Sequence, residues 1–315
     1  MSTRETNLSG QIDVGEYKAQ YDAYVKRILS DKQVLANIMV GVIPEYEGYT
    51  IEEAMACIES EPEVAKVRIR PGESIRGVNT ESAVPHEGKV TYDIVYTARV
   101  KVRGYQKIYI NVEAQKNYRP GYDLTTRGIF YSARLLSTQM DTEFTDENYD
   151  DIKKVYSIWI CMNTPVETNK GKNSGMQVSD SIVKYSIVPE VVYSEKNPEK
   201  VFIGRYDLLT CIFVCLKPDE TEKSKNKLIG MLSVFLSQTK SATEKKQILA
   251  DDYGMKMSKT VEEEVSSMCN LSDLIEEKAK IEAIRNMLKF GVSEEKILEV
   301  YTAEELAKAK EETVE

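Results

Sequence analysis

The sequence predicts an α/β fold in which helices flank a central mixed β-sheet and an α-helical C-terminal region follows. The main observation is the order of the patterns along residues 1–216: two helices, a β-hairpin, a helix and three strands. A second observation is that the patterns after residue 227 are helical. With 315 residues, 42% of them apolar, the chain can bury one sizeable core. We therefore expect a domain over 1–216 and a linker with a helical region over 217–315.

The N-terminal elements follow from helical spacing and capping signals. Apolar and aromatic residues from Tyr17 to Met39 recur at helical spacing, which predicts an amphipathic helix over 16–40 with a break near Ser30-Asp31. Thr50 followed by Glu53 is a capping box and predicts a short second helix that ends at Glu59. Gly, Pro, Asn and Ser are frequent over 71–88, which indicates a long loop.

The hairpin and the elements after it complete the predicted sheet. Strands are expected over 90–100 and 107–115, joined by a turn centred on Arg103-Gly104. Residues 123–140 predict a helix, and residues 153–162 predict a strand buried on both faces. The buried face of that helix is predicted to hold Leu124, Ile129, Phe130, Ala133, Leu136 and Met140. Further strands are expected over 182–193 and 201–216, a linker over 217–227, and helices over 228–238, 271–290, 293–301 and 302–310.

Several protein classes are excluded by what the sequence lacks. Its longest apolar runs are far shorter than the 18 or so residues that span a bilayer, and the N-terminus has no secretory pattern. We expect a cytoplasmic protein without a membrane segment. The five cysteines include no Cys-x-x-Cys pair, and the single histidine, His86, excludes a two-histidine zinc helix. The usual glycine-rich phosphate loops are also absent, which leaves carboxylates, lysines and a metal ion as the sources of chemistry.

Charge is unevenly distributed along a chain whose net charge is −9. Residues 241–315 carry 18 acidic and 11 basic side chains, so the helical tail is net acidic. In contrast, residues 99–134 carry eight basic and two acidic side chains. This segment is either a surface that contacts phosphates or an ordinary solvated face of a hairpin and a helix.

Two carboxylates in the predicted hairpin form the candidate site. Asp93 lies ten residues before Arg103 and Glu113 lies ten residues after it, so a symmetric antiparallel hairpin places them opposite each other. Strand alternation puts Thr91, Asp93 and Thr97 on one face of the first strand, and Asn111, Glu113 and Gln115 on one face of the second. An ionised Glu113 in an otherwise apolar strand requires a partner, and a divalent cation is suitable. The alternative is a structural ion pair with a nearby lysine or arginine.

These residues carry a family resemblance. Tyr92-Asp93, the segment 110–115 (Ile-Asn-Val-Glu-Ala-Gln) and the segment 127–134 (Arg-Gly-Ile-Phe-Tyr-Ser-Ala-Arg) with Gln139 resemble the PD-(D/E)XK nuclease superfamily. In particular, they resemble its branch of recombination-promoting nucleases, also described as PD-(D/E)XK nuclease family transposases. Shorter similarities lie at 79–81, 87–88, 155–159 and 268–271, so the resemblance extends over most of the chain.

The resemblance implies a restriction-endonuclease-like core over 1–216 and Mg²⁺- or Mn²⁺-dependent hydrolysis of DNA phosphodiester bonds. It implies that Asp93 and Glu113 bind metal, with the Ala114 carbonyl as a third ligand. Gln115 stands where the superfamily has lysine, and glutamine can orient water or a phosphate oxygen but supplies no positive charge. Lys116 points to the opposite face if the strand continues. An additional acid on an early helix is implied, for which the candidates are Glu45, Glu47, Glu81 and Glu87.

DNA is the expected partner. Arg127 and Arg134, two turns apart on the following helix, are predicted either to hold the DNA backbone or to form salt bridges at the sheet edge. Lys116 and Arg119 complete the predicted DNA-binding set. The acidic helical tail is a predicted homo-oligomerisation or interaction element. Two other functions remain open, a catalytically weakened DNA-binding or assembly factor of a mobile element, and a protein-interaction module in which the hairpin carboxylates are structural.

Overall fold

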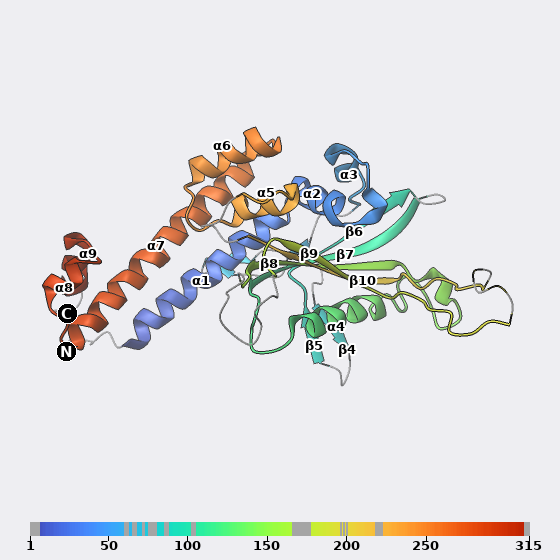
Figure 1. Ribbon diagram of the computed structural model, residues 1–315, viewed down its shortest axis with the longest axis horizontal. Coiled ribbons are helices and arrows are strands. Elements are labelled where there is room, and N and C mark those ends of the chain that lie inside the picture. Colours follow the sequence, from blue (N-terminus) through green and yellow to red (C-terminus); the bar gives the residue numbers. More distant parts are fainter. Residues whose placement is uncertain are drawn as a thin grey trace.

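The computed structural model describes residues 7–59, 63–64, 68–70, 73–74, 81–84, 88–101, 105–165, 178–195, 197, 199, 201–217 and 223–311. Its centre is a six-stranded mixed sheet with the strand order β1-β6-β7-β8-β10-β9 (Figure 1). Strands β7, β8 and β10 are parallel, whereas β6 and β9 run antiparallel to their neighbours. The strand bounds are β1 Glu63–Val64, β6 Ile94–Lys101, β7 Tyr105–Asn117, β8 Lys154–Asn163, β9 Ser181–Ser186 and β10 Leu209–Cys215.

Helices cover both faces of this sheet, which confirms the predicted α/β class. Helix α4 (Leu124–Ser137) packs against β8 and β10 on one face, while α1, α2 and α5 lie over the other (Figure 1). Helix α7 runs beside α1, and its far end packs with α8 and α9. The bounds of these helices are α1 Asn7–Leu29, α2 Lys32–Val42, α3 Ile51–Ala56, α5 Lys227–Leu236, α6 Ala242–Tyr253, α7 Lys259–Lys289, α8 Glu294–Leu298 and α9 Ala303–Glu311. None of the described helices combines the length and hydropathy needed to span a membrane.

The predicted break near Ser30-Asp31 is confirmed. The carboxylate of Asp31 caps α2 by accepting hydrogen bonds from the backbone N–H groups of Gln33 (2.9 Å) and Val34 (3.2 Å). The capping box at Thr50 is also present, although α3 ends at Ala56, three residues earlier than predicted. The segment 71–88, predicted to be a long loop, contains β3 (Glu73–Ser74) and begins the hairpin of β4 (Glu81–Val84) with β5 (Gly88–Thr91). Strand β3 pairs with β2 (Arg68–Arg70).

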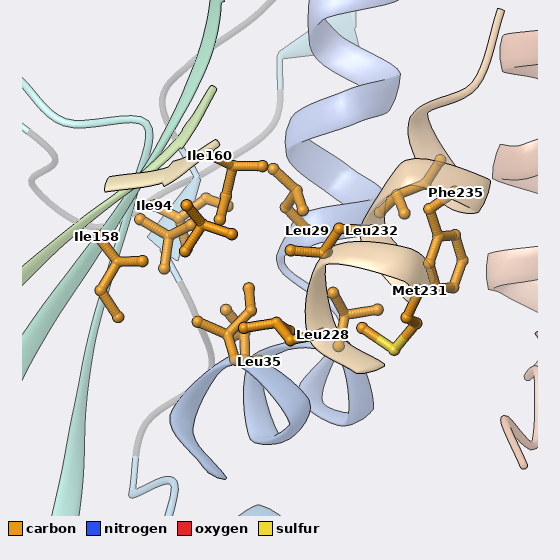
Figure 2. Close-up of a cluster of buried hydrophobic side chains, with 14 of the residues drawn as sticks. Leu29, Leu35, Ile94, Ile158, Ile160, Leu228, Met231, Leu232 and Phe235 are labelled. Carbon is orange, nitrogen blue, oxygen red and sulfur yellow. The ribbon is translucent and has the colours of Figure 1, made fainter. Parts of the chain in front are cut away.

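The largest core lies between the sheet and the helices α1, α2, α5 and α7. Figure 2 shows side chains of the sheet and of α1, α2 and α5 packed together, with Ile158 and Ile160 of β8 facing Leu29, Leu35 and Leu228. Because Leu228 and its neighbours in α5 belong to this cluster, the core includes side chains from both sides of the predicted boundary at 216. That boundary stays a prediction.

The face of α4 that packs on the sheet differs from the predicted one. Gly128, Ser132 and Leu135 are buried, whereas Ile129 and Phe130 are exposed. A Cβ atom at Gly128 would lie 2.7 Å from the Cys211 Sγ atom, so the helix approaches the sheet through its small residues. The prediction is confirmed for Leu124, which is buried, and in part for Leu136. It is wrong for Ile129, Phe130, Ala133 and Met140, because apolar spacing alone does not detect contacts made through glycine and serine.

Two of the predicted strands are shorter than expected. The segment 182–193 forms a strand only as far as Ser186, and the segment 201–216 becomes a strand only at Leu209. The intervening residues that the structure describes are irregular, despite their many β-branched and aromatic side chains. In the tail, α7 begins at Lys259, twelve residues earlier than predicted, and α6 precedes it. Gly254 ends α6 in the left-handed conformation, with φ at 66°.

Candidate metal and catalytic site

The register of the β6–β7 hairpin brings Asp93 and Glu113 together. Ile94 pairs with Val112 and Val95 with Asn111, so Asp93, one residue before β6, stands opposite Glu113. Two hydrogen bonds fix this arrangement. The backbone N–H of Asp93 donates to Glu113 Oε1 (3.2 Å), and the backbone N–H of Ala114 donates to Asp93 Oδ2 (2.9 Å). The hairpin pairing is therefore the one that a turn centred on residue 103 predicts, although residues 102–104 lie outside the described chain.

A break in the strand at Asp93 changes the predicted faces. The expected strand over 90–100 is divided into β5 and β6 at Tyr92-Asp93. Tyr92 packs with Leu135 of α4 on one side of the sheet, whereas Ile94 belongs to the main core on the other side. Strict alternation through Asp93 is therefore lost, and the Asp93 carboxylate contacts helix α1. Asn111 and Glu113 share one face, as predicted, but Asp93 reaches Glu113 through its backbone.

Glu113 is a buried carboxylate with neutral hydrogen-bond donors. Only 3% of the residue is exposed, and its Oε1 atom accepts from the Asn111 side-chain amide (3.1 Å) as well as from Asp93. Burial and the negative charge of Asp93 raise its pKa well above the ordinary value, against the opposing effects of the Asp93 N–H and the Arg127 charge. Beside it, the Oδ1 atom of Asn111 is buried without a hydrogen-bond partner. The site therefore contains acceptor oxygens in excess of donors.

Lys26 of α1 is the cation nearest to Asp93. Its ammonium lies 2.9 Å from Asp93 Oδ1 and 2.6 Å from Asp22 Oδ2, and its side chain is 12% exposed. Burial alone would lower the pKa of Lys26, but the charges of Asp93 and Asp22 outweigh it and raise the pKa. Burial also raises the pKa of Asp93 despite Lys26. Sequence reasoning missed Asp22 and Lys26, whose only signal was their i, i+4 spacing on a helix assigned to the core.

Gln115 and Lys116 follow the strand alternation. Gln115 is half-buried, and its side-chain amide donates to the Asn117 carbonyl (2.6 Å), so it does not touch the two carboxylates. Lys116 has its ammonium 5.3 Å from the centre of the Tyr21 ring of α1, on the opposite face from Glu113, as expected. Burial and the neighbouring Lys18 lower its pKa.

The predicted DNA-binding arginines have different surroundings. Arg119 is exposed, while Arg127 is half-buried and donates to the hydroxyls of Tyr122 (2.6 Å) and Tyr131 (2.8 Å). The Arg127 guanidinium also lies 5.3 Å from the ring centre of Trp159, the residue that pairs with Glu113 across β7 and β8. Arg134 is 4% exposed. A side chain buried to this degree does not reach a DNA backbone at the surface, so we do not assign Arg134 that role.

Of the four candidate acids, Glu45 is held away from Asp93. Glu45 lies near the other end of the sheet, where it pairs with Lys154 (2.7 Å) and accepts from the Tyr156 hydroxyl (2.6 Å). Glu47 is exposed, the side chain of Glu81 is not described, and Glu87 and His86 lie outside the described residues. Within the part of the chain that the structure describes, no group of three or more His, Cys, Asp or Glu residues could hold a metal ion.

A cavity of about 500 Å³ lies beyond the carboxyl ends of β7, β8 and β10. Its lining includes Asn117, Arg119, Asn163, Lys217 and Gln238. Since Glu113 is four residues before Asn117 on β7, the cavity and the carboxylate pair occupy the same end of the sheet. Ligands of α/β proteins commonly bind at this edge.

Comparison with known proteins gives no assignment for this arrangement. No protein-family model, no curated protein and no solved structure matches the chain. The similarity to the PD-(D/E)XK nucleases therefore remains a resemblance of motifs. The function has to be argued from Asp93, Glu113 and their surroundings.

Proposed function

We propose that the protein is a metal-dependent DNA endonuclease of the recombination-promoting nuclease type, with Asp93 and Glu113 as its metal ligands. The observation that carries this proposal is the pairing of the two carboxylates across the hairpin, where burial raises both pKa values. Such a pair is costly to keep ionised in a folded sheet, and perturbed carboxylates of this kind are typical of functional sites.

The donor chemistry of the site fits Mg²⁺ or Mn²⁺. Both are hard cations that bind oxygen ligands, and the site offers two carboxylates next to the unpartnered Oδ1 atom of Asn111. The family resemblance adds the Ala114 carbonyl as a further ligand. When bound, a divalent ion would lower the pKa of a coordinated water and neutralise charge on a phosphate.

The chain's own residues hold the site and orient the reactants. The Ala114 N–H and the Lys26 ammonium hold the Asp93 carboxylate, and the Asp93 N–H and the Asn111 amide hold Glu113. Gln115 would orient water or a phosphate oxygen through an amide that now donates to the Asn117 carbonyl. Gln115 is neutral, and Lys26 provides a positive charge next to Asp93 in its place. The exposed Arg119 would contact the DNA backbone.

A second function, DNA binding without cleavage, is favoured by one specific observation. The Lys26 ammonium, at 2.9 Å from Asp93 Oδ1, already neutralises one of the two carboxylates without a metal. Together with the neutral Gln115, this contact is compatible with a weakened enzyme that serves as a DNA-binding factor. The two functions differ in whether Mn²⁺ binds between Asp93 and Glu113.

The test combines metal binding with DNA cleavage. We expect Mn²⁺ to raise the melting temperature of the wild-type protein and to support nicking of supercoiled DNA. Asp93→Asn and Glu113→Gln should abolish both effects, whereas the control Glu143→Gln, which changes a carboxylate at the opposite end of β7, should retain them. Cleavage of equal rate in all four proteins would identify a contaminating nuclease and contradict the proposal. DNA binding with neither Mn²⁺ stabilisation nor cleavage would establish the second function instead.

A further inference from the structure

The chain between β9 and β10 forms an arm with an uncovered apolar surface. We define the arm by its described residues, 187–195 and 201–208, and it projects past the end of the sheet (Figure 1). Phe202 is 94% exposed, Val192 88% and Tyr193 82%, so these side chains have almost no contact with the rest of the chain. Other exposed apolar residues of the arm and the adjoining strand β9 are Val183, Tyr185, Ile187, Val188, Val201, Ile203 and Tyr206.

The base of the arm is fixed even though its apolar side chains are uncovered. The Arg205 guanidinium donates to the backbone carbonyls of Asp150 and Ile152, the latter at 2.8 Å. Asp207 pairs with Lys154 of β8 at 2.7 Å. The arm is therefore held in place by polar contacts at its base while it presents apolar residues outward. Large exposed apolar patches of this kind mark interaction sites.

The charge of the arm argues against a nucleic acid as its partner. Residues 187–208 contain four acidic and three basic side chains, so this segment is nearly neutral. DNA and RNA are bound chiefly by clusters of Lys and Arg, which the arm lacks. An apolar, nearly neutral surface fits a protein surface of the same character.

We infer that the arm is the interface through which two copies of this chain associate. The four aromatic side chains of the surface are Tyr185 (38% exposed), Tyr193, Phe202 and Tyr206 (44%). At roughly 150–250 Å² for each aromatic side chain, their exposed fractions amount to about 500 Å². Stable dimers bury about 800 Å² on each partner. The six aliphatic residues add to this area, so the exposed apolar side chains together provide about as much surface as one partner of such a dimer buries.

The contact is made by side chains of the arm and not by strand addition. Strand β9 ends the sheet, and its outer edge pairs with no strand among the described residues. However, Lys184 stands in the middle of β9, and a lysine on an edge strand opposes pairing with another strand. A two-fold contact between apolar arms leaves Lys184 in solvent and matches each apolar patch with an identical one.

The arm lies at the opposite end of the sheet from Asp93 and Glu113, whereas Val183 of β9 is in register with Glu113 but three strands away from it. The arm leaves β9 at Ser186, which pairs with Thr210 at the start of β10, while Glu113 lies in the last part of β7. Association through the arm therefore does not cover the end of the sheet that holds the carboxylate pair in either copy. The inference is independent of the proposed nuclease activity, and a test of oligomeric state can fail without affecting that proposal.

The test is sedimentation equilibrium of the full chain and two single variants, each checked for folding by a thermal melt. We expect the wild-type protein to be dimeric at micromolar concentration. Phe202→Asp should raise the dimer dissociation constant about 100-fold or more, because the substitution occurs twice in a two-fold interface and each buried anchor contributes about tenfold. The matched control is Phe290→Asp, which changes an equally uncovered phenylalanine (82% exposed) after α7 and should leave the dimer intact. A monomeric wild-type protein would overturn the inference. A dimer lost in Phe290→Asp and kept in Phe202→Asp would also overturn it, and would place the interface in the helical tail.

Discussion

Glu113→Gln should stabilise the metal-free protein, which is unusual for a substitution at a buried polar site. The new amide oxygen can accept from the same donors as the carboxylate, the Asp93 N–H and the Asn111 amide. The new NH₂ group can donate to the Oδ1 atom of Asn111, which has no partner in the wild-type structure. Pairing one buried unsatisfied acceptor is worth about 1–3 kcal/mol, and the substitution also removes a buried charge. We expect the free energy of unfolding to rise by about 1–2 kcal/mol near neutral pH.

The stability difference between the wild-type protein and Glu113→Gln should depend on pH. Burial and Asp93 raise the pKa of Glu113 in the folded state, so the folded protein holds a proton that the unfolded chain releases. The wild-type protein therefore loses stability as the pH rises from about 4.3, the ordinary pKa of a glutamate, through the raised folded value. Glu113→Gln has no titrating group at this position, so its stability does not fall in this way as the pH rises. The difference between the two proteins should be smallest in acid and should grow with pH.

Glu143→Gln is the matched control because the same substitution should have the opposite effect. The Glu143 carboxylate accepts from the Lys107 ammonium and from the Tyr109 hydroxyl (2.5 Å). Although burial works against it, these donors lower the pKa of Glu143, so its contribution to stability is present near neutral pH and is lost as the pH falls through the lowered value. Lys107 is partly exposed, and we expect a loss of only about 1 kcal/mol at neutral pH.

Urea unfolding in the presence of EDTA, followed by the fluorescence of Trp159, measures both effects. Trp159 is the single tryptophan, is fully buried and pairs with Glu113 in the sheet. The reasoning would be refuted if Glu113→Gln lowered the free energy of unfolding near neutral pH. A gain that did not change with pH would also refute it, because the gain would then not come from the titration of Glu113.

Three further substitutions test other parts of the structure. Lys26→Met removes a partly buried ion-pair partner of Asp93, so urea unfolding should show a decrease of about 2 kcal/mol in the free energy of unfolding. Calorimetric titration of the same variant should show tighter Mn²⁺ binding, because the ammonium no longer competes for that carboxylate. Gly128→Ala should lower the free energy of unfolding by about 1–3 kcal/mol in a urea titration. The new Cβ atom would lie 2.7 Å from Cys211 Sγ and 2.8 Å from Phe213 Cζ, and this overpacking exceeds the gain of about 1 kcal/mol in helix propensity. Lys245→Met should lower the free energy of unfolding by about 1–3 kcal/mol, because the buried ammonium donates to the carbonyls of Phe235 (3.1 Å) and Ser237 (2.6 Å) at the end of α5. An unchanged urea midpoint would contradict a stabilising role for these hydrogen bonds.

The hairpin register was the part of the site that the sequence could predict. Asp93 and Glu113 are equally far from residue 103, and a symmetric antiparallel pairing needs only the position of the turn. The contact between Lys26 and Asp93 joins residues far apart in the chain, and its formation depends on how α1 packs across the sheet. A single sequence contains no local pattern for such a contact. The break at Tyr92-Asp93 was also missed, because the residues on either side of it have strand-like composition.

In the arm, the sequence pattern predicted strands that the structure does not contain. Its Val, Ile, Tyr and Phe residues are part of the strands predicted over 182–193 and 201–216, yet the described residues of the arm are irregular. β-branched and aromatic side chains favour a strand only where a neighbouring strand and a packed face receive them. Beyond the end of the sheet, the described residues of one copy provide neither for the arm. The same composition then leaves an apolar surface that is uncovered in the monomer.

An ionised Glu113 can stabilise the fold only if a positively charged side chain of the protein neutralises it. Lys26 lies between Asp22 and Asp93. The charge of Arg127 lowers the pKa of Glu113 but offsets only part of the effect of burial and of Asp93. The hydrogen-bond donors that reach Glu113 are a backbone N–H and the side-chain amide of Asn111, and neither is charged. Neutral donors offset only part of the cost of an ionised buried carboxylate. Glu113 is therefore either protonated in the free protein or paired with a cation that the described residues do not provide. The proposed metal ion would supply the second state, and it would then offset the cost of keeping this buried carboxylate ionised.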